Sequence, residues 1–220
     1  MRLLLISATA LTLLALAVGA WAFARGPSKI ESDEIAAVLA PIGDADAPPA
    51  YAHCASCHLH DGSGRPDGAI PRLNGQRQAV LESKLHRMRA GLTSLPVMAP
   101  FARTLSAREV TEVAAYLSGL PDTPAQLAVA PDDTGSEGAT SFGELCASCH
   151  GANAEGHDGL FASRLCGQYE GYMARRLDEV RAGARGDADA VMRGVLEGLG
   201  ERDLAPVLHW LAAGNGCSTP

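Results

Sequence analysis

The 220-residue sequence is poor in aromatic side chains, which make up 5% of it, and poor in basic groups relative to acidic ones. With 25 acidic and 18 basic side chains, the formal net charge is −7. This balance argues against nucleic acid and anionic lipid as partners. The sequence also has no convincing strand pattern, no organic-cofactor motif and no paired acid and base. These absences argue against an enzyme that builds its own substrate pocket.

Six cysteines are present, and four of them belong to a pentapeptide that occurs twice. It reads Cys-Ala-Ser-Cys-His at residues 54–58 and again at 146–150. Two thiols three positions apart, followed by an imidazole, are the attachment signature of c-type haem. On one helical turn, two sulfurs can bond the vinyl groups of one porphyrin while the histidine points at the iron. We therefore predict two covalently attached haem c groups, bound through Cys54, Cys57, Cys146 and Cys149 and ligated by His58 and His150.

Two other kinds of site use closely spaced cysteines. A zinc site uses Cys-x-x-Cys pairs, but it does not require a histidine after each pair, and no further ligand cluster is present. A thioredoxin-like redox pair is typical of a strand-helix-strand setting, which the sequence does not indicate. Haem attachment is the interpretation that accounts for both copies.

The N-terminal segment carries no charge between residues 3 and 24 and follows a basic residue, Arg2. It is either a cleaved secretory signal or a retained membrane anchor, because it contains small-x-small cleavage patterns and yet is about long enough to span a bilayer. In both cases we expect the rest of the chain to be exported, to the periplasm. Without residues 1–24 the net charge becomes −8, which favours docking to proteins with basic patches.

The two halves of the chain repeat each other. At the 92-residue offset of the pentapeptides, Gly75-Gln76 matches Gly167-Gln168, and residues 89–91 match 181–183. Further along, the offset becomes 94, so that Tyr116 matches Trp210. The sequence therefore predicts a duplication.

Each half has the same predicted helices and no competing strands. In the last helix of the first half, apolar residues recur at i, i+3, i+4 and i+7, and Ser106 with Glu109 is typical of a capping box. The predicted helices are 138–149 before the second motif, 77–90 and 169–182 after the haem loops, and 106–118 and 201–213 at the ends. We predict an all-α fold of two tandem domains, with 1–24 as signal or anchor, 25–49 as lead-in, 50–120 as domain 1, 121–137 as linker and 138–220 as domain 2.

Each half resembles a class I cytochrome c domain, and the pair resembles the cytochrome c4 family of dihaem electron carriers of the bacterial periplasm. The resemblance covers about residues 50 to 216 and rests on the pentapeptides, on Leu73-Asn74-Gly75-Gln76 and Leu165-Cys166-Gly167-Gln168, and on a methionine before each last helix. It implies a few helices wrapped around each haem. It also implies iron held by histidine on one side and methionine on the other.

Duplication selects the methionines. Met98 and Met192 correspond at the 94-residue offset, and each precedes by seven residues the leucine that leads into a last helix. Met88 and Met173 have Val180 and Leu81 as counterparts, which cannot ligate iron. We expect Met98 and Met192 to be the sixth ligands.

The resemblance also implies a backbone carbonyl that supports each proximal histidine. Pro71 stands at the matching position of the first half, and Ser163 replaces it in the second. A second departure precedes the motifs: where the second half has Gly138 and Phe142, the first half has other residues and two prolines. We therefore expect a short or differently entered first helix in the first half.

The two remaining cysteines are Cys166 and Cys217. As a disulfide they would tie the C-terminal segment to the second domain, and the chain-entropy model values such a loop at about 4 kcal/mol. Two free buried thiols or a redox role are the alternatives.

We therefore expect an electron carrier rather than an enzyme. It would pass single electrons between redox proteins, namely a membrane electron donor and a terminal oxidase or reductase. One alternative is a cytochrome subunit of a larger membrane-bound dehydrogenase or oxidase complex. The other is a haem enzyme of peroxidase or thiosulfate dehydrogenase type, which needs an open axial position.

Overall fold

A computed structural model describes residues 46–121, 134–186, 190–214 and 217. The chain divides into two units, Met1–Ile42 and Gly43–Pro220, and all described residues belong to the second. The predicted signal or anchor, most of the lead-in and most of the linker lie outside the described residues. Within the described ranges, no helix is both long enough and apolar enough to cross a membrane.

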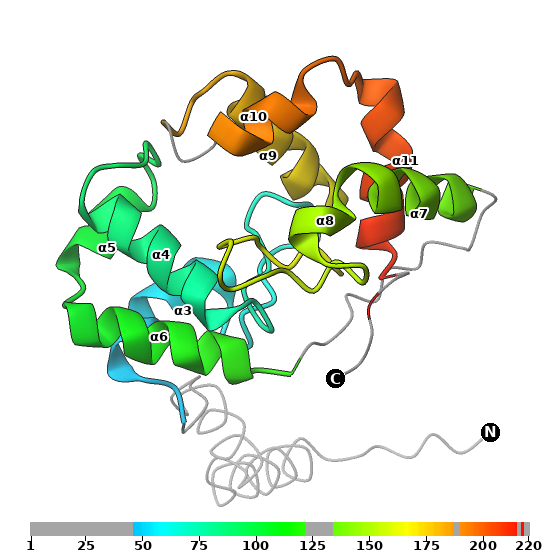
Figure 1. The fold of residues 1–220 in the computed structure, drawn as a ribbon. Helices are drawn as coiled ribbons and strands as arrows, with labels where there is room; N and C mark the ends of the chain where they lie inside the picture. Colours follow the sequence, from blue (N-terminus) through cyan, green and yellow to red (C-terminus); the bar gives the residue numbers. More distant parts are fainter. Residues whose placement is uncertain (1–45, 122–133, 187–189, 215–216, 218–220) are drawn as a thin grey trace, which may run out of the picture. The chain divides into compact units, whose positions relative to one another are not determined.

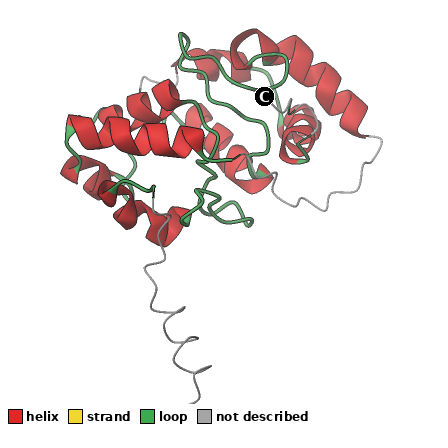
Figure 2. Ribbon diagram, turned by 90° about the horizontal axis from the view of Figure 1, so that it is seen from below, coloured by secondary structure: helices red, strands yellow, loops and turns green. Residues whose placement is uncertain are grey.

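The described chain consists of helices joined by loops, which confirms the predicted fold class (Figures 1 and 2). Its only β-type pairing is a single bridge between His157 and Ala162. The first half comprises η1 (Pro49–Tyr51), α3 (Ala52–His58), α4 (Gln78–Arg89), α5 (Ala99–Thr104) and α6 (Ala107–Gly119). The second half comprises α7 (Thr134–Leu145), α8 (Ala147–His150), α9 (Glu170–Arg181), α10 (Ala190–Leu196) and α11 (Glu201–Ala212).

The helix bounds repeat as the sequence does. α4 and α9 begin and end 92 residues apart, and α6 and α11 begin 94 residues apart. Three features differ from the predictions. α7 begins at Thr134, inside the predicted linker, with Glu137 in its first turn, where a negative charge favours a helix. A break at Cys146 separates α7 from α8. Two short helices, α5 and α10, form around the predicted methionine ligands.

In the second half, the first helix packs against the last, α7 on α11 (Figure 1). Gly138 makes this possible, because a Cβ atom there would overlap the Pro206 carbonyl oxygen. Next to it, the rings of Phe142 and Trp210 pack with their centroids 5.1 Å apart. Close approach at a glycine therefore joins the helices, and the aromatic pair fills the core.

The first half builds the same contact with a different residue. Its entry is the single turn η1, as the prolines before the motif led us to expect. Tyr51 in this turn is fully buried, and its ring lies 5.0 Å from that of Tyr116, the counterpart of Trp210. The Tyr51 hydroxyl also donates to the Leu59 carbonyl at 2.7 Å. A tyrosine from a shorter element thus replaces the missing long helix.

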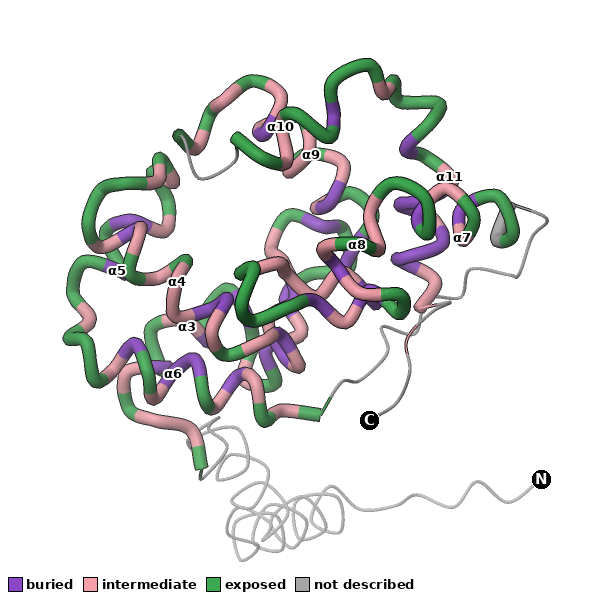
Figure 3. The backbone as a smooth tube through the Cα atoms, in the orientation of Figure 1, coloured by how far each residue is buried: buried purple, intermediate pink, exposed green. Residues whose placement is uncertain are grey.

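The last helix of each half buries the predicted apolar stripe, which appears as buried tube segments in Figure 3. In α6, the predicted capping box forms: the Ser106 hydroxyl accepts from the Glu109 N–H at 3.2 Å, and the Glu109 carboxylate accepts from the Ser106 N–H at 2.7 Å. The buried residues of the stripe are Val110, Val113, Ala114 and Leu117 in α6, and Leu204, Val207, Leu208 and Leu211 in α11.

Leu59, directly after the first motif, has a strained backbone. Its φ of 63° and ψ of 166° lie in a region that essentially only glycine occupies. Its repeat counterpart is Gly151, with φ 82° and ψ 154°. The second half therefore meets this requirement with glycine, whereas the first half does not.

Replacing Leu59 by glycine is expected to raise the free energy of unfolding by about 1 kcal/mol. Relief of strain worth about 1–3 kcal/mol outweighs the backbone entropy cost of glycine, about 0.5–1 kcal/mol. The burial that is lost is partial, because Leu59 is 45% exposed. Denaturant unfolding of the haem-loaded protein measures the change. Leu92→Gly is the control, because this exposed leucine has no positive φ and its replacement should destabilise. Equal losses in both variants would contradict the strain.

Candidate functional site

The haem loops are the segments that follow the motifs, residues 59–77 between α3 and α4 and residues 151–169 between α8 and α9. Each motif histidine donates to a backbone carbonyl of the haem loop in its own half. His58 ends α3, and its Nδ1 lies 3.1 Å from the Pro71 carbonyl oxygen. His150 ends α8, and its Nδ1 lies 2.8 Å from the Ser163 carbonyl oxygen. Serine thus offers the same backbone acceptor as proline, and the two halves share one arrangement.

These bonds fix the tautomer of both histidines. A carbonyl oxygen only accepts, so Nδ1 must carry the proton, which leaves the lone pair on Nε2. Both imidazoles are buried. Burial lowers the pKa of His58 and of His150, although the backbone hydrogen bond acts in the opposite direction. Each ring is therefore neutral at neutral pH and can offer Nε2 to a metal.

The motif cysteines lie on or next to the helical turn that ends in each histidine. Cys54 and Cys57 lie in α3, Cys146 is the N-cap of α8, and Cys149 lies within α8. All four thiols are free of disulfides. Burial raises the pKa of Cys54 and of Cys146, which is the opposite of what thiolate redox catalysis requires. Within the described ranges, no group of three or more His, Cys, Asp or Glu side chains could hold a metal ion.

The four candidate methionine ligands occupy two kinds of position. Met88 in α4 and Met173 in α9 are buried in helix packing. Met98, the N-cap of α5, and Met192, in α10, are only partly buried. The thioethers selected by the repeat are thus those at the margin of the protein packing.

Exposed apolar residues lie close in sequence to those two methionines in both halves. Val97 and Val191 are 74% and 76% exposed, and they correspond at the 94-residue offset. Phe101 and Val195 correspond in the same way and are also exposed. Exposed apolar residues repeated beside each methionine fit a site that is completed by a large apolar group. Together with the free Nε2 atoms and thiols, they fit haem c in each half.

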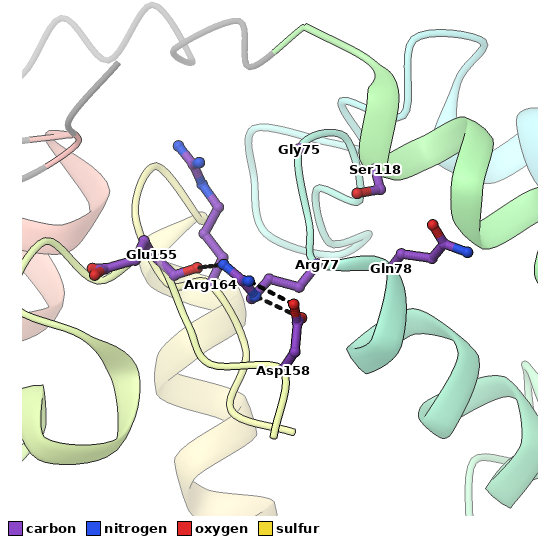
Figure 4. Close-up of a pocket in the computed structure, with 7 residues that line it drawn as sticks. All are labelled: Gly75, Arg77, Gln78, Ser118, Glu155, Asp158 and Arg164. Atoms are coloured by element: carbon purple, nitrogen blue, oxygen red, sulfur yellow. Dashed lines mark hydrogen bonds and ion pairs between the residues drawn. The ribbon is translucent and has the colours of Figure 1, made fainter. Parts of the chain in front are cut away.

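The two halves meet through their haem loops, and we call this contact region the seam. The contacts at its two edges are not equivalent. On one edge, the Arg77 guanidinium donates twice to the Asp158 carboxylate, at 2.6 Å each, within a cavity also lined by Glu155 and Arg164 (Figure 4). These bonds, chiefly, hold the pKa of Asp158 below its usual range. Tyr169, the counterpart of Arg77, instead donates its hydroxyl to the Ser63 carbonyl at 2.8 Å.

Arg175 extends the second edge. Its guanidinium donates to the Gly68 carbonyl at 2.6 Å. Gly68 has φ +76°, and a Cβ there would lie 2.6 Å from the backbone nitrogen of Tyr172. The first haem loop therefore packs directly on the start of α9.

Cys166 and Cys217 are joined by a disulfide, with their Cα atoms 5.5 Å apart. Cys166 is buried in the core of the second half, among residues of α7, α9 and α11. The bond ties the segment after α11 to that core.

Sequence reasoning missed the residues that join the halves. Gln76 and Gln168 served only as evidence of duplication and of the family resemblance, yet both are buried and bond across the seam. Their recurrence at one offset was a signal, but it did not indicate what they contact. The other histidines include the exposed His53 and the partly buried His209, which lies 3.4 Å from the Glu170 carboxylate.

Comparison with known proteins identifies both halves. A family model described as "Cytochrome C oxidase, cbb3-type, subunit III" matches residues 50–117, and one described as "Cytochrome c" matches residues 135–213. A thiosulfate dehydrogenase electron acceptor of Thiomonas intermedia (strain K12) is 32% identical over 183 residues, which cover 79% of this chain and 84% of that protein. Cytochrome c4 of Stutzerimonas stutzeri is 30% identical over 77% of this chain and 88% of that protein.

Solved structures agree with these relatives. The crystal structure of reduced recombinant cytochrome c4 from Pseudomonas stutzeri matches with a TM-score of 0.66 and 26% identity, covering 75% of this chain and 95% of that one. A thiosulfate dehydrogenase (TsdBA) from Marichromatium purpuratum matches with a TM-score of 0.57 and 31% identity, but this chain covers 36% of it. The chain carries two cytochrome c domains with one haem-attachment motif each, and it belongs to the dihaem class I cytochromes c, the electron-carrier family of cytochrome c4.

Proposed function

We propose that His58 and Met98 are the axial ligands of one haem iron, and His150 and Met192 those of the other. When bound, each haem c supplies an iron that exchanges single electrons. Cys54, Cys57, Cys146 and Cys149 hold the two groups by thioether bonds. The observation that carries this proposal is the repeated Nδ1-to-carbonyl bond, which leaves each Nε2 free. That bond also orients the ring and raises its basicity.

The methionines are assigned by position and chemistry. A thioether opposite histidine raises the reduction potential, which suits an electron carrier. Met98 and Met192 are partly buried at equivalent positions, whereas Met88 and Met173 fill the packing of α4 and α9. Two His/Met sites leave no exchangeable position for a substrate, which favours electron transfer over catalysis.

We infer that the protein works in the periplasm and accepts electrons from a sulfur-oxidising dehydrogenase. Two relatives, 32% and 30% identical, are named thiosulfate dehydrogenase electron acceptors, and they support this class of donor. A terminal oxidase or reductase would take the electrons onward. The net charge of −7 favours basic docking surfaces on both partners.

Rapid mixing tests the donor. The ferric protein is mixed with thiosulfate and a thiosulfate dehydrogenase, and haem absorbance is followed. We expect both haems to become reduced, at a rate that falls as salt is added, because screening weakens steering between oppositely charged surfaces. Thiosulfate without the dehydrogenase is the control and should leave the protein oxidised. Rapid turnover of thiosulfate or peroxide by this protein alone would contradict a pure carrier.

A second candidate is a cytochrome subunit of a membrane-bound oxidase complex. The match of residues 50–117 to a cbb3-type subunit III model favours it, as does 31% identity to a cbb3-type subunit of Rhizobium leguminosarum bv. viciae, of which this chain covers 56%. N-terminal analysis of the protein from native membrane and soluble fractions separates the candidates. An intact segment 1–24 in the membrane fraction supports the subunit, and a cleaved one in the soluble fraction supports the carrier.

A further inference from the structure

Each half contributes one glutamine that forms hydrogen bonds with the haem loop of the other half. Gln76 of the first half bonds both backbone groups of Arg164: its Oε1 accepts from the Arg164 N–H at 2.8 Å, and its Nε2 donates to the Arg164 carbonyl at 3.0 Å. Gln168 of the second half does the same with Arg72, at 3.1 Å and 2.9 Å. Gln76 and Arg72 have Gln168 and Arg164 as their counterparts at the 92-residue offset, so the exchange is reciprocal.

Both glutamine side chains are buried, and their hydrogen bonds fix the orientation of each side-chain amide. Gln76 and Gln168 are 9% and 7% exposed. Each Oε1 also accepts from the N–H of the next residue, Arg77 at 3.1 Å or Tyr169 at 3.0 Å. Only one orientation of each side-chain amide satisfies these donors and acceptors, because the oxygen must face N–H groups and the nitrogen must face a carbonyl.

Each glutamine thereby reaches the peptide group that supports the opposite histidine. The N–H of Arg72 and the carbonyl of Pro71 belong to the same planar amide. Gln168 bonds its N–H end, and His58 Nδ1 bonds its carbonyl end. In the second half, the amide between Ser163 and Arg164 lies in the same way between Gln76 and His150.

Hydrogen bonds in such a chain strengthen one another. An acceptor on the N–H end polarises the amide, and its carbonyl oxygen becomes a better acceptor for the histidine. A stronger bond at Nδ1 makes the imidazole more basic at Nε2, which stabilises a more highly charged metal. This series of hydrogen bonds, from glutamine through the backbone amide to histidine, lies buried between the two halves, so water does not compete for its donors and acceptors.

We propose that Gln76 and Gln168 are crossed positioning residues: each sets the reduction potential of the haem bound to the other half. Gln168 acts through the amide of residues 71–72 on His58, and Gln76 acts through the amide of residues 163–164 on His150. The inference rests on the proposed histidine ligation. The contact between the two halves then helps to determine the reduction potentials of both haems.

Site-resolved redox titration tests the crossing. In Gln168→Leu, we expect the midpoint potential of the His58 haem to rise, and to rise more than that of the His150 haem. In Gln76→Leu, the larger rise should occur at the His150 haem. NMR signals of the haem and axial methionine methyl groups report the two irons separately. Gln78→Leu is the matched control: the Gln78 side chain is exposed and donates to the Glu82 carboxylate within α4, so both potentials should stay unchanged.

A second readout excludes a merely structural role. The Nδ1 proton of the histidine opposite the changed glutamine should exchange faster with water and shift upfield, while that of the other histidine stays as it was. If the leucine variants do not fold, Gln168→Asn and Gln76→Asn keep an amide in the seam but shorten its reach, and the same crossed pattern is expected. Shifts at the haem of the glutamine's own half, equal shifts at both haems, or no shift would overturn the inference.

These outcomes are separate from those that test the ligation. If the methionine-to-iron charge-transfer bands survive loss of Met98 or Met192, the proposed ligand set is wrong. If both bands persist in the glutamine variants and the shifts are not crossed, only the role of Gln76 and Gln168 is wrong.

Discussion

Replacing Met98 by alanine is expected to abolish the sulfur-to-iron charge-transfer band of one ferric haem and leave the other unchanged. In a separate variant, Met192→Ala should remove the band of the other haem in the same way. The affected potential should fall by on the order of a tenth of a volt or more, since axial ligands set haem potentials over a span of about 0.8 V. The physical reason is that a thioether favours ferrous iron, and water or no ligand does not. Absorption near the charge-transfer band and a redox titration measure both effects.

Met173→Leu is the matched control for these variants. Met173 is buried among residues of the second-half core, and its repeat counterpart, Leu81, is already a leucine. A volume-conserving exchange should cost less than about 1.5 kcal/mol and leave both bands intact. Survival of both bands in Met98→Ala, or loss of one in Met173→Leu, would show that the ligands are assigned wrongly.

Loss of the disulfide is expected to be the largest change in stability. Cys217→Ser should lower the free energy of unfolding of the second half by about 4 kcal/mol, because the bond closes a loop between residues 51 positions apart. Cys217 suits the substitution better than Cys166, since it is only partly buried. Denaturant unfolding followed at each haem separates the two halves, and the first half should unfold as before.

Reductant provides the control for this variant. With the haems held ferrous in every sample, it should lower the unfolding midpoint of the wild-type second half to that of Cys217→Ser, and it should leave the variant unchanged. A wild-type protein that is insensitive to reductant, together with an unchanged variant, would mean that the bond does not stabilise the folded protein.

The sequence alone determined the chemistry and the repeating elements. Haem attachment depends on neighbours within one helical turn, so residues 54–58 and 146–150 identify it without any tertiary information. The long helices were predictable for the same reason: a stripe at i, i+3, i+4 and i+7 is a local pattern, and α6 and α11 bury it as predicted. The repeat offset added the pairing of Met98 with Met192.

Only the tertiary structure decided how each core is completed. The sequence indicated that the first half lacks a counterpart of Phe142, but not that Tyr51, from a different register, would take its place against Tyr116. Nor did it indicate the short helices α5 and α10, whose few residues carry too little periodicity to be recognised. Such choices depend on the volume left between packed helices.

The exchange between the halves was also beyond the sequence. Gln76 and Gln168 contact partners 88 and 96 residues away. In each case the partner is a backbone group, which every residue type presents alike. A local pattern records which residues recur, and the docking of two surfaces decides what they meet. The sequence therefore determines that this protein holds two haems, and the seam between its halves decides how each histidine is supported.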